Sequence, residues 1–188
     1  MKRLLLVGAI LLLCLTGCGK EEKPQEQSVV ITPVSTFDVD MSHYQNMSSV
    51  NHHFKGITPE TYFNLIRTNG NAIIYIGYDT CPVCNRAVSI MEEVADELDL
   101  VIYYIDCYHP LYPLVDYIEE FMDITDPVLL PNDEGEKAIL TPHVLTLING
   151  EFVESWVGID GLDPEASEDD YQKVYDKYKS MMECFKVD

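Results

Sequence analysis

Hydrophobic residues along the chain follow two different periods, and the change from one to the other marks a point of interest. The run at 72–76 is continuous, apolar and rich in β-branched residues, which predicts a strand buried on both faces of a sheet. Farther on, apolar residues recur every three or four positions, which predicts an amphipathic helix; they are Ala87, Val88, Met91, Val94, Ala95 and Leu98. Cys81-Pro82-Val83-Cys84 lies between these two segments.

The rest of the pattern alternates strands with helices. Further helices are predicted at 58–67, 113–122 and 168–184, and further strands at 100–105, 143–148 and 151–157. Asn149-Gly150, between the last two strands, is a strong signal for a tight hairpin. Because strands that alternate with helices form layered sheets, the pattern predicts an α/β fold with a central mixed β-sheet flanked by helices on both faces.

The acidic segment near 123–137 interrupts this alternation. It is broken by Pro127, Pro131 and Gly135, and it is longer than the usual short connection before a strand. We therefore expect it to be an insertion within the domain.

The first residues predict export rather than a folded element. Lys2 and Arg3 precede an apolar stretch at 4–15, which is too short for a spanning helix of about 20 residues and indicates a signal peptide at 1–17. Leu15-Thr16-Gly17-Cys18 resembles the bacterial lipobox, which implies that Cys18 is acylated and becomes the first residue after cleavage. The alternative is a signal peptide without lipid that has a cysteine near its end.

The segment after Cys18 is polar and without periodicity, so it cannot bury enough apolar surface to fold. We expect residues 18–50 to form a lipidated N-terminus and flexible tether, followed by one folded domain at 51–188. The expected location is the extracytoplasmic face of a bacterial cell membrane, where disulfides are permitted.

The charge balance limits the partners of this domain. The chain has 12 Lys and Arg against 32 Asp and Glu, which gives a formal net charge of −20. A strongly acidic surface repels phosphates, so no nucleic-acid partner is expected.

The cysteine motif points to thiol chemistry because of what surrounds it. Pro82 suits the first position of a helix, where its missing N–H costs nothing, and Cys81 then lies at the helix cap with an exposed sulfur. Helix amides that point at this sulfur stabilise its thiolate, so Cys81 is the expected nucleophile. Cys84, one turn into the helix, is less exposed and is the expected resolving thiol.

Two other interpretations of the cysteines stay open. Zinc sites use the same spacing, so Cys81 and Cys84 could instead be a structural disulfide or half of a metal site. Cys107 and His109 could also ligate a metal, but they lack further spaced partners, and Cys107 is expected to be a packed thiol. We therefore predict no metal, and no cofactor beyond the redox-active Cys81–Cys84 pair.

Several markers at 58–182 together resemble the thioredoxin superfamily. They are the Cys81 to Cys84 motif at a helix start, Thr141-Pro142 before a strand, and the Asn149-Gly150 hairpin followed by Gly158. The resemblance implies a thioredoxin-like fold in which Pro142 is cis and faces the active-site sulfurs. It also implies that the backbone at Thr141 and Pro142 binds an extended client segment.

The motif region at 75–84 is similar to that of thioredoxin-like bacterial lipoproteins of the bacteriocin transport accessory type. Two positions depart from thioredoxin itself. Thr80 stands where a tryptophan usually precedes the first cysteine, and Tyr75 stands where a buried carboxylate usually assists proton transfer to the second. These departures leave open how the site handles protons.

The predicted function is that of a membrane-tethered thiol–disulfide oxidoreductase. Its expected partners are exported proteins or peptides, held as transient mixed disulfides, together with a membrane electron donor or acceptor. The dipeptide Pro82-Val83 has no cation and Asp79 lies two residues upstream of Cys81, so the pair is not expected to be among the strongest oxidants. The alternative is a thioredoxin-like accessory or binding module for peptide (bacteriocin) export, in which redox turnover is incidental.

Overall fold

Five strands form the central sheet of the computed structural model, which describes residues 28–158 and 167–186. In spatial order they are β2 (Phe54–Gly56), β4 (Ile102–Asp106), β3 (Ala72–Gly77), β7 (His143–Ile148) and β8 (Glu151–Val157). The first three run parallel, while β7 is antiparallel to β3 and β8 is antiparallel to β7. The sheet is therefore mixed, as the sequence predicts.

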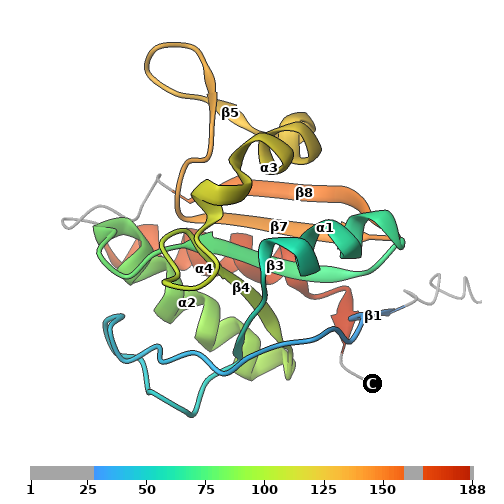
Figure 1. The fold of residues 1–188 in the computed structure, drawn as a ribbon. Helices are drawn as coiled ribbons and strands as arrows, with labels where there is room; N and C mark the ends of the chain where they lie inside the picture. The colour runs from blue at the N-terminus through green and yellow to red at the C-terminus, as the bar shows by residue number, and fades with distance from the viewer. Residues whose placement is uncertain (1–27, 159–166, 187–188) are drawn as a thin grey trace, which may run out of the picture.

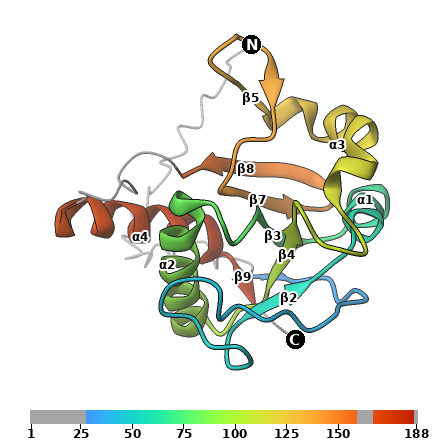
Figure 2. The same cartoon turned by 60° about the vertical axis from the view of Figure 1, so that its left-hand side comes forward.

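Helices cover both faces of this sheet (Figures 1 and 2). On one face, α2 (Pro82–Leu98) packs against α4 (Glu168–Met182), and on the other face α1 (Pro59–Arg67) packs against α3 (Ile118–Thr125). All six residues of β3 are buried, because this strand lies in the middle of the sheet with a helical layer on each side. The prediction of an α/β fold with a flanked mixed sheet is confirmed.

The hairpin between β7 and β8 forms at the predicted residues. Asn149 and Gly150 both adopt positive φ angles, 54° and 75°, which a tight hairpin turn of this kind requires. The Gly150 N–H donates to the Gly70 carbonyl at 2.8 Å, and a Cβ at Gly150 would lie 2.4 Å from the carbonyl oxygen of Ile66. Gly150 is thus needed both for its φ and for its close approach to the loop after α1.

The helix predicted at 113–122 is divided in the structure. A 3₁₀ turn, η1 (Leu114–Tyr117), precedes α3, and a second one, η2 (Asp126–Val128), follows it. The acidic segment then forms a two-stranded hairpin of β5 (Leu130–Pro131) and β6 (Lys137–Ala138), which projects away from the central sheet (Figure 1). The final helix ends at Met182, two residues earlier than predicted.

The prediction of a tether reaching residue 50 is wrong for its described part, 28–50. β1 (Val29–Val30) pairs in parallel with β9 (Phe185–Lys186), and Ile31, Met41 and Tyr44 are buried in the core. These apolar residues are too widely spaced to produce a periodic signal, yet each fills a site on the finished domain. The signal peptide at 1–17 and Cys18 lie outside the described residues. Within the described ranges, no helix combines the length and hydrophobicity that a membrane span requires.

Candidate active site

The sulfur of Cys81 lies at the N-terminus of α2. Cys81 is the N-cap residue, and its Sγ accepts the backbone N–H of Cys84 at 3.1 Å. Pro82 occupies the first helical position, where it forgoes no hydrogen bond, and the first turn contains no acidic residue. An amide hydrogen bond and the positive end of the helix dipole both favour negative charge on this sulfur.

The Asn85 side chain forms hydrogen bonds with the loop that precedes α2. Its Nδ2 donates to the carbonyls of Asp79 and Cys81, at 2.6 and 3.2 Å, and its Oδ1 accepts the Gln45 N–H at 3.0 Å. The N-terminal segment therefore reaches the active-site loop and helps to hold it.

Thr141 and Pro142 lie on the other side of the Cys81 sulfur. The peptide bond between them is cis, as the family resemblance implies. The Thr141 carbonyl oxygen and Oγ1 lie 3.9 and 3.8 Å from Cys81 Sγ. Helix α2 and the loop before β7 thus bring the four predicted site residues of the domain to one place: Cys81, Cys84, Thr141 and Pro142.

Cys81 is more enclosed than predicted, whereas the burial of Cys84 agrees with the prediction of a less exposed thiol. Cys81 is 5% exposed and Cys84 is fully buried, whereas the sequence predicts an open sulfur at the helix cap. The difference arises because the loop at Thr141 folds over Cys81, a long-range contact that the local sequence does not reveal. Burial, followed by the hydrogen bond with Cys81, raises the pKa of the Cys84 thiol well above its usual value. Cys84 therefore keeps its proton at neutral pH.

A cleft of about 270 Å³ lies next to Thr141, the residue that contacts the Cys81 sulfur. Thr141 and Tyr78 form its inner wall, and much of the rest is apolar side chains from the segment after β4 and from α3. Several large hydrophobic residues of this segment are exposed, among them Tyr108 at 67%, Leu111 at 74% and Val115 at 62%. We call this region, formed by Tyr108, Leu111, Val115 and Ile118, the apolar rim.

Cys107 lines the same cleft but does not form a metal site with its neighbours. Its thiol is half-buried, and burial, followed by the charge of Asp106, raises its pKa to about 12. Among residues 28–158 and 167–186, no three potential His, Cys, Asp or Glu ligands are placed to hold a metal ion. The geometry fits the packed thiol that the sequence predicts.

Sequence reasoning singled out Tyr75 near the second cysteine but missed Tyr104 and Tyr44, which lie together with it. Tyr75 of β3 is stacked on Tyr104 of β4, with ring centroids 5.1 Å apart, and the Tyr104 hydroxyl is hydrogen-bonded to that of Tyr44 at 2.8 Å. Tyr75 and Tyr104 are direct partners in the parallel pairing of β3 with β4. That register is the signal that could have revealed Tyr104, whereas Tyr44 lies in the segment predicted to be a tether.

Comparison with known proteins yields structural neighbours only. No protein-family model and no curated protein matches the chain. Thioredoxin O2 from Arabidopsis thaliana aligns with 60% of this chain and 89% of its own, at 16% identity and a TM-score of 0.41. A thioredoxin from Aeropyrum pernix aligns with 67% of this chain and 85% of its own, at 22% identity and a TM-score of 0.42.

These similarities are too low to carry any conclusion about activity. The chain's own topology, with parallel β2, β4 and β3, antiparallel β7 and β8, and helices on both faces, is that of a thioredoxin-like fold. The protein is a thioredoxin-fold domain that carries a dithiol at the N-terminus of a helix, next to a cis proline.

Proposed function

We propose that this protein is a thiol–disulfide oxidoreductase that acts on exported proteins or peptides. The observation that carries the proposal is the unequal placement of two neighbouring thiols. Cys81 Sγ accepts an amide hydrogen bond at the positive end of α2, whereas Cys84 is fully buried and holds its proton. Cys81 is thus suited to attack a client disulfide, and Cys84 stays protonated until the resolving step.

The reaction follows from this inequality. The Cys81 thiolate attacks one sulfur of a client disulfide, so a mixed disulfide forms and the other client sulfur leaves as a thiolate. Cys84 then loses its proton and attacks Cys81 Sγ, which releases the second client sulfur. The client is reduced by two electrons and the Cys81–Cys84 pair is oxidised to a disulfide. The same steps in reverse oxidise a client dithiol.

Client binding is supported by the surface around the cleft. The backbone at Thr141 and Pro142 lies beside the sulfur, where an extended client segment could pair with it. The apolar rim lies on the same side and offers apolar contacts to such a segment. Together they favour polypeptide clients over small polar disulfides.

The membrane-anchored location is proposed from the sequence. The basic start, the apolar stretch at 4–15 and the lipobox-like ending at Cys18 support export and acylation. Because the domain begins to pack at Val29, its distance from an anchor at Cys18 is limited to about 40 Å. Membrane fractionation of cells that express the full chain, compared with Cys18→Ala, tests this: the variant is expected in the soluble fraction.

Insulin reduction with dithiothreitol as the electron source tests the proposed activity. The wild-type chain is expected to accelerate the reaction, and Cys81→Ser is expected to abolish the acceleration. Cys84→Ser is expected to accumulate mixed disulfides with clients, since the resolving step is blocked. Stoichiometric zinc in the purified reduced protein would contradict the redox assignment and favour a structural metal site.

The exposed apolar rim also favours the accessory role as a second candidate function. In that case the domain binds an exported peptide such as a bacteriocin, and thiol exchange is incidental. Equal client binding and equal support of export by wild type and by Cys81→Ser would establish this role. Loss of both in the variant would leave the oxidoreductase as the function.

A further inference from the structure

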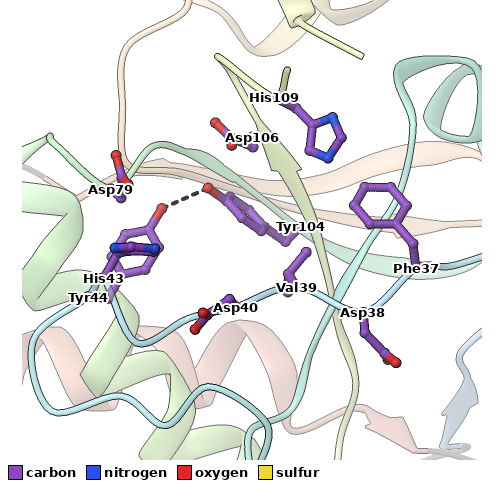
Figure 3. Close-up of a pocket in the computed structure, with 10 residues that line it drawn as sticks. All are labelled: Phe37, Asp38, Val39, Asp40, His43, Tyr44, Asp79, Tyr104, Asp106 and His109. Atoms are coloured by element: carbon purple, nitrogen blue, oxygen red, sulfur yellow. Dashed lines mark hydrogen bonds between the residues drawn. The ribbon is translucent and has the colours of Figure 1, made fainter. Parts of the chain in front are cut away.

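Three tyrosine side chains from distant parts of the chain meet beneath Cys84. Tyr75 and Tyr104 come from adjacent strands of the sheet, and Tyr44 comes from the N-terminal segment that packs over them. The rings of Tyr75 and Tyr104 are nearly parallel, with an interplanar angle of 16°. The hydroxyls of Tyr44 and Tyr104 are joined by a hydrogen bond of 2.8 Å (Figure 3).

The hydroxyl of Tyr75 is fully buried and makes no hydrogen bond with any described residue. It nevertheless interacts electrostatically with the Cys84 thiol and the Tyr44 hydroxyl, and burial raises its pKa well above the usual value. Gly77 makes room for it, because a Cβ at that position would lie 2.1 Å from the Tyr75 oxygen. A buried hydroxyl without a partner is destabilising.

The far end of this group opens into an acidic pocket of about 190 Å³ (Figure 3). Tyr44 and Tyr104 form part of its wall together with Asp79 and Asp106, and the charge of Asp106 acts on both tyrosine hydroxyls. Burial raises the pKa of Asp106, which makes this carboxylate a better proton acceptor than an exposed one. A pocket of this size has room for several water molecules.

We propose that Tyr75, Tyr44 and Tyr104 relay the proton of the Cys84 thiol to the carboxylate of Asp106 when Cys84 resolves the mixed disulfide. The Cys84 proton passes to the Tyr75 oxygen as the Tyr75 proton passes to Tyr44. The Tyr44 proton passes to Tyr104, and the Tyr104 proton passes to Asp106. Every tyrosine is neutral before and after the transfer, and rotation of the hydroxyls restores the starting arrangement.

The sulfur chemistry that accompanies the transfer is the resolving step of the proposed function, on which this inference rests. The Cys84 sulfur forms a bond with Cys81 Sγ, and the bond between Cys81 Sγ and the client sulfur breaks. The client leaves as a thiolate, and the electron pair of the former S–H bond enters the new disulfide. The client disulfide is the only oxidant that the sequence of steps needs.

The need for a relay arises from the surroundings of Cys84. Its raised pKa makes the thiolate scarce at neutral pH, so a base speeds its attack. The titratable groups that act on Cys84 or respond to it are its neighbour Cys81, Cys107 of the cleft, and the tyrosines at 44, 75, 78 and 178. None of these is a carboxylate. Asp106, which is faced by Asp79, His109 and the N–H of Tyr108, supplies one at the end of the tyrosine group.

Tyr178 provides a matched control for Tyr75. Its hydroxyl is also fully buried, lies close enough to Cys84 to be affected by it, and has no hydrogen-bond partner among the described residues. Tyr178 lies on α4, however, where its ring packs against Trp156 and not against the Tyr44–Tyr104 pair. A Tyr→Phe change at either position removes a buried, unpaired hydroxyl and keeps the ring, but only the change at 75 interrupts the relay.

The test uses the reduced full chain and the symmetrical disulfide of nitrothiobenzoate in a stopped-flow mixing experiment. Every variant carries Cys184→Ser, because the exposed Cys184 would react with the same disulfide. Release of the first coloured thiolate then reports the attack by Cys81, and release of the second reports resolution by Cys84. Tyr75→Phe is expected to slow the second release by at least about tenfold while the first changes by less than about twofold, in line with the contribution of a general base. Tyr178→Phe is expected to leave both releases unchanged.

The pH dependence of the second release adds a signature that a packing defect would not produce. In the wild type it should rise as Asp106 ionises and then level off, since the relay ends on that carboxylate. In Tyr75→Phe and in Asp106→Asn it should keep rising about tenfold per pH unit, since hydroxide is then the only base. Equal second-phase rates and pH profiles in wild type and Tyr75→Phe would overturn the relay. Absence of any second release in the wild type would instead overturn the proposed function.

Discussion

The two active-site sulfurs are three residues apart in sequence, yet their surroundings differ in kind. Cys81 contacts Thr141, which lines the neighbouring cleft, and a backbone amide donates to its sulfur. Cys84 is fully buried above Tyr75, in a part of the core where the nearest polar groups are hydroxyls and thiols. One helical turn thus separates a sulfur that accepts an amide hydrogen bond from a thiol whose burial opposes negative charge.

This difference shows that the two thiols depend on different parts of the fold. Charge on Cys81 is favoured by the end of α2, which any helix with this motif would offer. The protonated state of Cys84 depends instead first on its burial in the core, which residues far away in sequence provide. The first feature can be changed by local substitutions near the motif, and the second by substitutions far away in sequence.

The largest expected effect comes from removing each sulfur in turn. Cys81→Ser should lower insulin reduction by at least about a thousandfold, because the nucleophile is lost. Cys84→Ser should keep single-turnover attack within about threefold of the wild type, because the amide that contacts Cys81 is a backbone group. Non-reducing gels and mass spectrometry of the trapped mixed disulfide measure the two effects. Similar residual turnover in both variants would contradict the assignment of distinct roles.

Sequence predicted the Cys81 side of this comparison much better than the Cys84 side. The helix start, the position of Pro82 and the hairpin at Asn149-Gly150 follow from local rules, and all three are confirmed. The burial of Cys81 by the loop at Thr141 and the packing of Tyr44 against Tyr104 both depend on contacts between residues about 60 apart in the chain. Such contacts leave no local pattern, so the sequence predicted an exposed sulfur and a tether in their place.

Gly77→Ala tests the packing on the Cys84 side. The new methyl group would meet the Tyr75 hydroxyl at 2.1 Å and its Cζ at 2.5 Å, in a strand that is buried throughout. The change should lower the free energy of unfolding by on the order of 3 kcal/mol, as expected for overpacking in a core. Urea denaturation measures this loss, and part of it should be recovered in the Tyr75→Phe background, where the nearest atom is absent. If the changes in the free energy of unfolding of the two single variants simply add up in the double variant, the methyl group does not clash with the Tyr75 hydroxyl.

The Cys81 side has its own buried titratable group in His143, the residue after Pro142. It is fully buried, its Nε2 is hydrogen-bonded to Ser155 Oγ at 2.8 Å, and burial lowers its pKa to about 4. In the unfolded chain His143 becomes protonated below about pH 6.5, whereas in the folded domain it stays neutral until about pH 4. The free energy of unfolding therefore falls as the pH falls from about 6.5 toward 4. Between pH 7 and pH 5 the loss should be about 2 kcal/mol. Urea unfolding at both pH values measures this loss. Glutamine cannot titrate, so the pH-dependent loss in His143→Gln should be smaller than in the wild type by about 2 kcal/mol.

The smallest expected effect comes from Asn85, whose side chain ties the loop before Cys81 to the N-terminal segment. Asn85→Ala removes three hydrogen bonds, but the groups they leave lie near the surface, where water replaces the side chain, so the free energy of unfolding should fall by only about 1 kcal/mol. The loop should become more mobile, which would slow attack by Cys81 more than resolution by Cys84. Tyr44, the neighbour of Gln45, keeps its hydrogen bond with Tyr104 when the Asn85 side chain is lost. Stopped-flow release of the two nitrothiobenzoate equivalents separates these steps. Equal slowing of both would mean that the two sulfurs share one supporting structure, and the contrast between their surroundings would then have no kinetic counterpart.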